Sequence, residues 1–105
     1  MLNNSPTNTF VNKFEHCINS YKSLVKNIAT EIIPANKTRA YACFVNNSFT
    51  EITLILGNPN EGTINKGIVI NPAGSYEITN LNLYLGKVSA ISASDCQLSY
   101  VECSY

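Results

Sequence analysis

Every apolar segment in this chain is about as long as one β-strand, and turn-forming residues follow each of them. The apolar stretch 52–57, with a single threonine in it, has the length of one strand. After Pro34, clusters of Pro, Gly and Asn recur at intervals of about 8 to 12 residues, a spacing typical of small sandwiches and barrels. The chain is therefore predicted to be mainly β, as a small antiparallel β-sandwich or barrel.

The expected strands follow from residue alternation between the turns. In 39–45, Tyr41, Cys43 and Val45 fall on one face, while alanines and Phe44 fall on the other. Further short strands are expected at 52–56, 68–70, 76–78, 88–93 and 97–103, the last two forming a hairpin that turns at Ser94 and Asp95. Residues 57–67 are predicted to be a loop, and 81–85 an apolar connection. A compact β domain is thus expected over 34–105.

Residues 1–33 follow a different pattern and are predicted to form an N-terminal arm. Aromatic and aliphatic residues recur at steps of three and four from Phe10 to Tyr21, which favours a short helix near 10–20. Residues 25–33 are rich in β-branched side chains and run into Pro34, which favours a strand. The arm is therefore expected to be extended and partly helical.

The charge balance excludes several classes of partner. The 105 residues carry seven basic and seven acidic side chains, only 13% of the chain. A neutral chain lacks the basic patch that nonspecific nucleic-acid or anionic-membrane binding requires, so neither partner is expected. Amides and hydroxyls are abundant instead, with 15 Asn and 10 Ser. This surface suits close neighbours in an assembly, although an AT-rich genome would produce the same bias.

The cysteines are expected to be free thiols. Neither a secretory signal pattern nor an apolar run of membrane-spanning length occurs, so folding in a reducing cytosol is expected. Cys17, Cys43, Cys96 and Cys103 lack metal-ligand spacing, so no metal site is predicted. Cys43, which lies in an apolar strand, is predicted to be a small buried residue.

No group of residues predicts catalysis. A Ser-His-Asp site would have to bring His16 in the N-terminal segment to Asp95 in a turn, and no nucleophile motif surrounds any serine. Phosphate-loop, dinucleotide and calcium-loop motifs do not occur in the sequence. We therefore expect a protein that is not an enzyme and has no catalytic, cofactor-binding or metal-binding residues.

Four short motifs lie between residues 32 and 102. They are Pro-Ala-Asn-Lys-Thr-Arg at 34–39, Asn-Asn-Ser at 46–48, Gly-Ile-Val-Ile-Asn-Pro-Ala-Gly at 67–74 and Gly-Lys-Val-Ser-Ala-Ile-Ser-Ala at 86–93. Together they resemble the motifs of a set of small tailed-phage virion proteins. The family's Pro-Gly-Gly turn is replaced by Pro-Ala-Gly at 72–74. The guanidinium of Arg39 is expected either to cap loop carbonyls or to pair with a glutamate.

The resemblance implies a structural protein made in the host cytoplasm and located on the capsid exterior. Such proteins decorate or cement phage heads by binding the major capsid protein between capsomers, often as homotrimers. The apolar residues of the arm, Phe10, Phe14, Ile18 and Tyr21, are the candidate assembly interface. A head-tail connector, a tail component and a small carbohydrate- or receptor-binding module are the alternatives.

Overall fold

The computed structural model describes residues 14–105 and confirms a mainly β, antiparallel sandwich. It contains eight strands and one 3-10 turn. The strands are β1 (His16–Leu24), β2 (Thr30–Ile33), β3 (Arg39–Val45), β4 (Ile52–Leu56), β5 (Ile68–Ile70), β6 (Ser75–Ile78), β7 (Val88–Ser92) and β8 (Cys96–Ser104), with η1 at Pro59–Glu61.

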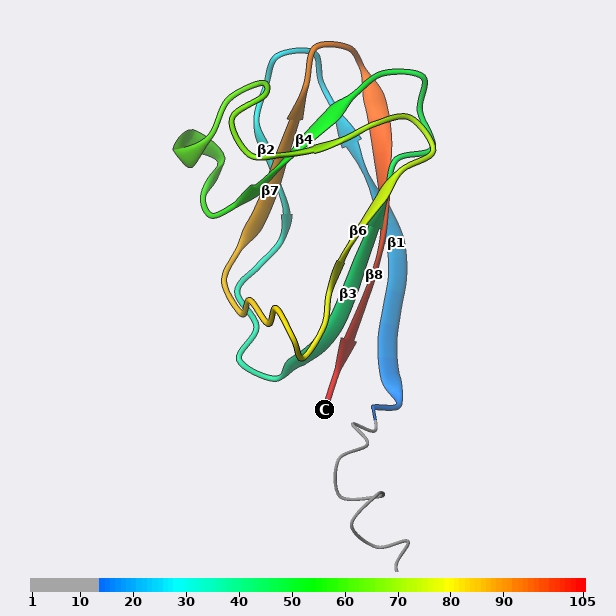
Figure 1. Ribbon diagram of the computed structural model, residues 1–105, viewed down its shortest axis with the longest axis vertical. Helices are drawn as coiled ribbons and strands as arrows, with labels where there is room; N and C mark the ends of the chain where they lie inside the picture. Colours follow the sequence, from blue (N-terminus) through cyan, green and yellow to red (C-terminus); the bar gives the residue numbers. More distant parts are fainter. Residues whose placement is uncertain (1–13) are drawn as a thin grey trace, which may run out of the picture.

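The strands form two four-stranded antiparallel sheets that face each other (Figure 1). Sheet A has the order β1-β8-β3-β6, and sheet B has the order β2-β7-β4-β5. Apart from the β4–β5 hairpin, each strand is followed by one in the other sheet. The predicted hairpin at the C-terminal end is therefore wrong: β7 pairs with β2 and β4, whereas β8 pairs with β1 and β3.

The core lies between the sheets and follows the two-residue period of the strands. Phe44 and Leu98 of sheet A and Leu54 of sheet B are fully buried, as are alanines that let the sheets approach closely. The alternation read from the sequence of 39–45 is confirmed, because Ala42 and Phe44 face the core while Tyr41 does not.

The predicted N-terminal arm needs two corrections. The residues proposed as a helix near 10–20 include the beginning of β1, which pairs with β8 from His16 to Leu24 without a register shift. The predicted strand near 25–33 is shorter and is β2, which pairs with β7. Since both strands belong to the sandwich, the domain begins before residue 34. Pairing with β8 overrides the helical spacing, because β1 lies beside β8 in register along all nine of its residues.

Asn46, the first residue of the Asn-Asn-Ser motif, joins two loops at one end of the sandwich. Its fully buried amide donates to the carbonyls of Thr50 and Ile70, both at 2.8 Å, and its Oδ1 accepts from Ser48. Its backbone N–H donates to Gly74. The motif thus fixes the β3–β4 and β5–β6 connections against each other, a structural role.

Arg39 makes both kinds of contact anticipated for it. Its buried guanidinium donates to Glu102 Oε2 at 2.7 Å and to the carbonyl oxygens of Pro34, Tyr84 and Gly86 at 2.7–3.0 Å. Three segments meet around this one side chain. The expectation that Arg39 caps carbonyls or pairs with a glutamate is confirmed.

The alanine of the Pro-Ala-Gly turn at 72–74 lies in the left-handed region of backbone conformation. Ala73 has φ of 68°, a region that costs an alanine roughly 1 to 2 kcal/mol and a glycine almost nothing. We expect Ala73→Gly to raise the free energy of unfolding by about 0.5–1 kcal/mol after the glycine's entropy is counted. Urea unfolding tests this, with Ala93→Gly, at a residue without positive φ, as the matched control. Equal losses of stability in both variants would contradict it.

Candidate assembly interface

The two outer faces of the sandwich differ, because a loop covers that of sheet B. Residues 57–67 fold over β4 and β7, and the hydroxyl of Ser89 donates to the carbonyl of Gly57 at 2.8 Å. The N–H of Asn65 donates to Thr53 Oγ1 at 3.0 Å. As a result, Ile55, Thr53 and Ser89 point outward from their sheet and are nevertheless buried. This face is largely occupied by the chain itself.

No such loop covers the outer face of sheet A in the part of the chain that the structure describes. The side chains there alternate with the core residues of the same strands. They are Cys17, Asn19, Tyr21 and Ser23 of β1, Gln97, Ser99, Val101 and Cys103 of β8, Tyr41, Cys43 and Val45 of β3, and Ser75 and Glu77 of β6. Glu77 is the single acidic or basic residue of this set. Uncharged side chains with tyrosines among them are typical of the centre of a protein–protein interface.

Tyr41 of β3 contacts both a carboxylate and an aromatic ring on this face. Its hydroxyl donates to Glu77, so the face's one carboxylate already has a partner. This hydrogen bond, with some burial, raises the pKa of Tyr41 above its ordinary value and keeps the phenol neutral. The ring of Phe14 stacks on Tyr41, with centroids 6.2 Å apart and an angle of 7° between the rings.

The structure separates the four interface residues predicted from the sequence. Phe14 and Tyr21 lie on the outer face of sheet A, where Tyr21 is 57% exposed. Ile18, 60% exposed, points to the opposite side of β1, and Phe10 lies outside the described residues. The helical spacing that grouped them does not apply to a strand, in which residues 18 and 21 face opposite ways.

Sequence reasoning missed Tyr41 and Val101, which extend the face beyond β1. The alternation of 39–45 was a usable signal, since it placed Tyr41, Cys43 and Val45 on one side. Alternation alone does not show which of the two sides faces the core. That depends on the pairing of β3 with β8 and β6.

Two of the four cysteines form a disulfide and two are free thiols. Cys17 and Cys103 lie directly opposite each other in β1 and β8 and form a disulfide on the outer face. Cys43 and Cys96 are free, and Cys43 is half-buried on the outer face rather than in the core. The prediction of four free thiols is therefore wrong for two of them, because nothing in the sequence spacing shows that residues 17 and 103 are neighbours.

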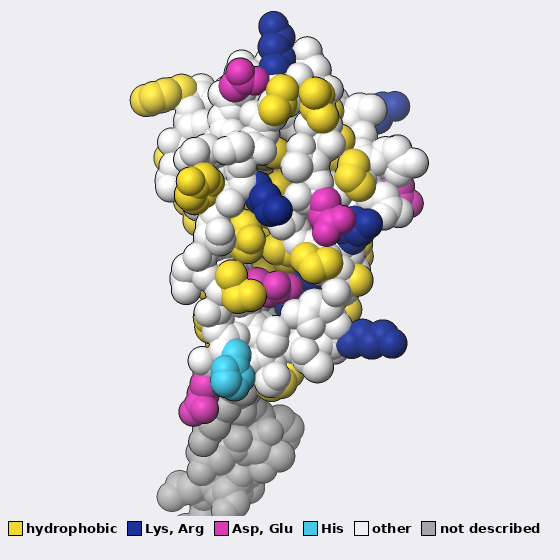
Figure 2. Space-filling view, turned by 180° about the vertical axis from the view of Figure 1, so that it is seen from behind, with side chains coloured by type: hydrophobic (Ala, Val, Ile, Leu, Met, Phe, Trp, Pro, Cys, Tyr) yellow, Lys and Arg dark blue, Asp and Glu magenta, His cyan; other side chains and the backbone are white. Residues whose placement is uncertain are grey.

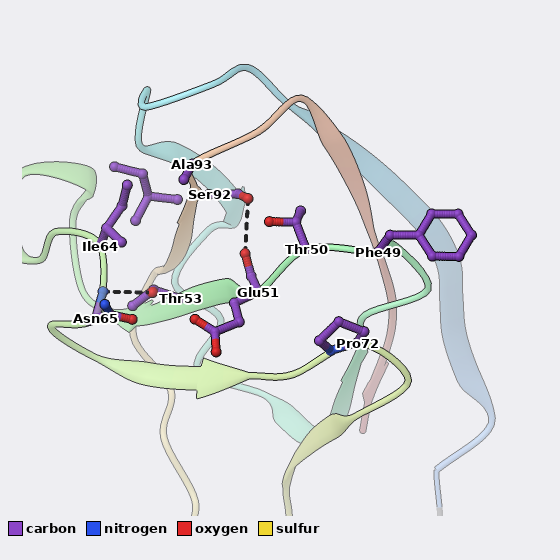
Figure 3. Close-up of a pocket in the computed structure, with 10 residues that line it drawn as sticks. Phe49, Thr50, Glu51, Thr53, Ile64, Asn65, Pro72, Ser92 and Ala93 are labelled. Carbon is purple, nitrogen blue, oxygen red and sulfur yellow. Dashed lines mark hydrogen bonds between the residues drawn. The ribbon is translucent and has the colours of Figure 1, made fainter.

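Sheet B carries a surface cleft of about 330 Å³ beside the covering loop (Figure 3). Its lining includes Glu51, Asn65, Ile64 and Pro72, and Glu51 is its single ionisable residue. His16 lies at the start of β1 and Asp95 beyond its other end, since Leu24 pairs with Cys96. These two residues are about 30 Å apart along an extended strand of about 3.3 Å per residue. They are not brought together.

Figure 2 shows, on one side of the molecule, hydrophobic, basic and acidic side chains interspersed among uncharged polar ones, without a patch of one charge sign. Groups of three or more potential metal ligands do not occur among residues 14–105. In the same residues, no helix is long and apolar enough to cross a membrane. Comparisons with protein-family models, with curated proteins and with solved structures found no match to this chain.

Proposed function

We propose that this chain is a structural virion protein that decorates or cements the capsid of a tailed phage. It binds the major capsid protein between capsomers on the capsid exterior, and its oligomer is a homotrimer, as in the proteins that its motifs resemble. The capsid-binding surface is the outer face of sheet A.

The uncharged outer face of sheet A carries this proposal. Burying a charged side chain without a partner costs several kcal/mol, whereas amides, hydroxyls and tyrosines can exchange water for protein hydrogen bonds at little net cost. On this face the lone carboxylate, Glu77, is already bonded by Tyr41. The fixed loops around Asn46 and Arg39 add a rigid frame, which reduces the entropy lost on binding.

A small binding module for carbohydrate is the second candidate, and the cleft beside Glu51 favours it. The cleft offers a carboxylate, the Asn65 amide and an apolar wall. It has no stacked aromatic platform, because the ring of Phe49 points away from the other lining residues in Figure 3. The two candidates use opposite sheets, so substitutions on each side distinguish them.

Particle stoichiometry tests the proposed function. Particles of the phage that encodes this chain are purified, and its copies are counted by quantitative mass spectrometry against the major capsid protein. A cement protein is expected in hundreds of copies per particle, a number set by the capsid lattice. Six or twelve copies would indicate a connector. Absence from particles would refute any virion role.

A charge placed on the outer face of sheet A should prevent capsid binding. Val101→Lys sets an ammonium between β1 and β3, and we expect at least a tenfold loss of affinity for heads lacking the protein, or about 1.4 kcal/mol or more. The matched control is Val69→Lys on β5 of sheet B, which is exposed and should bind like the wild type. Thermal unfolding of both variants checks the fold. Full decoration by Val101→Lys would contradict the assigned surface.

A further inference from the structure

β1 is an edge strand of sheet A with an unusually open hydrogen-bonding edge. It pairs with β8 over nine residues without a register shift, and eight of those residues are exposed. In Figure 1 it lies at the margin of the sheet, with β8 on its inner side. Long, regular edges of this kind accept a further strand unless something protects them.

The other three edges of the sandwich are protected. β5 has three residues, β6 has four, and β2 has four with a register irregularity between Glu31 and Ile33. Short length and bulges are the usual means of preventing edge pairing. β1 has neither a bulge nor a proline, and Lys22 is its one permanently charged residue. Among the strands that the structure describes, β1 is thus the edge open to a partner.

The pairing with β8 determines which backbone groups of β1 are free. The Cα atoms of Cys17 and Cys103 are 4.0 Å apart, the close spacing of a non-hydrogen-bonded antiparallel pair. Such pairs direct their N–H and C=O groups away from each other. By alternation, Cys17, Asn19, Tyr21 and Ser23 therefore present their backbone groups to the open edge.

This arrangement is complementary to itself. In an antiparallel β1–β1 contact with Ser20 on the two-fold axis, Asn19 lies opposite the partner's Tyr21, and Cys17 lies opposite the partner's Ser23. All four free residues are then paired in both copies, with about eight backbone hydrogen bonds. The exposed side chain of Ile18 lies against the methylenes of the partner's Lys22. A net charge of zero removes long-range repulsion between copies.

We propose that β1 is a two-fold contact between two copies of this chain, which joins their A sheets into one eight-stranded sheet. The contact goes beyond the proposed capsid binding and does not depend on it. Because it is two-fold, it cannot be the contact within a trimer. On a capsid it would link neighbouring trimers.

Cysteine crosslinking tests the register. Ser20→Cys, with Cys43→Ser and Cys96→Ser, places two thiols on the axis with Cα atoms about 4.5 Å apart, within disulfide range. We expect it to become mostly a covalent dimer in a glutathione redox buffer. Ser75→Cys on the exposed edge β6, in the same background, is the control and should stay monomeric on the gel. Equal crosslinking of the two variants would overturn the proposal.

A proline substitution tests the edge itself. Asn19→Pro removes an N–H that points away from β8, so the edge is blocked without a loss of pairing inside the sheet. Sedimentation is measured at about 0.5 mM protein, because even weak edge pairing with a Kd near 0.1 mM is populated there. The wild type and Asn19→Ala are expected to have a mass that is an even multiple of 11.5 kDa. Asn19→Pro should lose that association. A wild type of one or three times 11.5 kDa, or an Asn19→Pro variant that associates like the wild type, would refute the contact.

Discussion

Replacing Arg39 by methionine is expected to lower the free energy of unfolding by about 3–5 kcal/mol and the melting temperature by more than about 12 °C. The substitution leaves the Glu102 carboxylate buried, with the Asn36 amide at 3.3 Å as its remaining side-chain donor. It also removes the donor to three loop carbonyls, at Pro34, Tyr84 and Gly86. Thermal unfolding followed by circular dichroism measures the effect.

An exposed ion pair provides the control for this prediction. Lys87 and Glu31 are 3.3 Å apart with 34% and 42% of their side chains exposed, so Lys87→Met should cost less than about 1 kcal/mol. Adding Glu102→Leu to Arg39→Met should restore part of the loss, because no uncompensated charge then remains buried. A double variant no more stable than Arg39→Met would show that the stranded carboxylate is not the cause.

Much of the fold could be predicted because it depends on local patterns. Turns at Pro34, Asn46 and Pro72 end the strands, and alternation within 39–45 reports which residues share a face. The partners of Arg39 were also foreseeable as a class, since a guanidinium opening an apolar strand needs acceptors. These inferences use only residues near one another in sequence.

The assignment of strands to sheets could not be predicted in this way. β7 and β8 are separated by a short turn, and in sequence they look like a hairpin, yet they lie in different sheets. Likewise, nothing near residue 17 indicates that its neighbour is residue 103. Such pairings depend on how the whole core closes, which local alternation does not encode.

The candidate site was predicted in part. Phe14 and Tyr21 do lie on the open face of sheet A, but they were selected by helical spacing, which also included Ile18 on the other side of β1. The absence of charge along the outward positions of the strands is the better criterion for this surface. It can be applied only when the inward positions are known, and for this reason the sequence did not identify Tyr41 and Val101.

Loss of the Cys17–Cys103 disulfide is the second large effect, and Cys17→Ser should cost the oxidised protein about 2–4 kcal/mol. The bond joins the first and last strands of the sandwich across a sequence separation of 86, so it restricts most of the unfolded chain. It also holds the N-terminal end of β1 against β8. This end is exposed, since the single buried residue of β1, Leu24, lies at the opposite end of the strand. Urea unfolding with and without reductant measures the change in the free energy of unfolding.

Cys96→Ser is the matched control, because Cys96 pairs with no other cysteine. Reductant should lower the urea concentration at the unfolding midpoint of Cys96→Ser and of the wild type alike. The unfolding midpoint of Cys17→Ser should not change. A wild-type midpoint unaffected by reductant would contradict the prediction. Hydrogen exchange localises the effect. In Cys17→Ser, the backbone amides of Ile18 and Ser20, which pair with β8, should lose protection at milder conditions than the amide of Leu98.

The disulfide also makes the proposed virion role testable by redox chemistry. A chain made in a reducing cytoplasm carries Cys17 and Cys103 as thiols, and the bond can form once particles reach an oxidising medium. Decorated particles are therefore expected to lose this protein at a lower urea concentration in reductant than without it. With particles carrying Cys17→Ser the two concentrations should be equal, because there the bond cannot form in either medium.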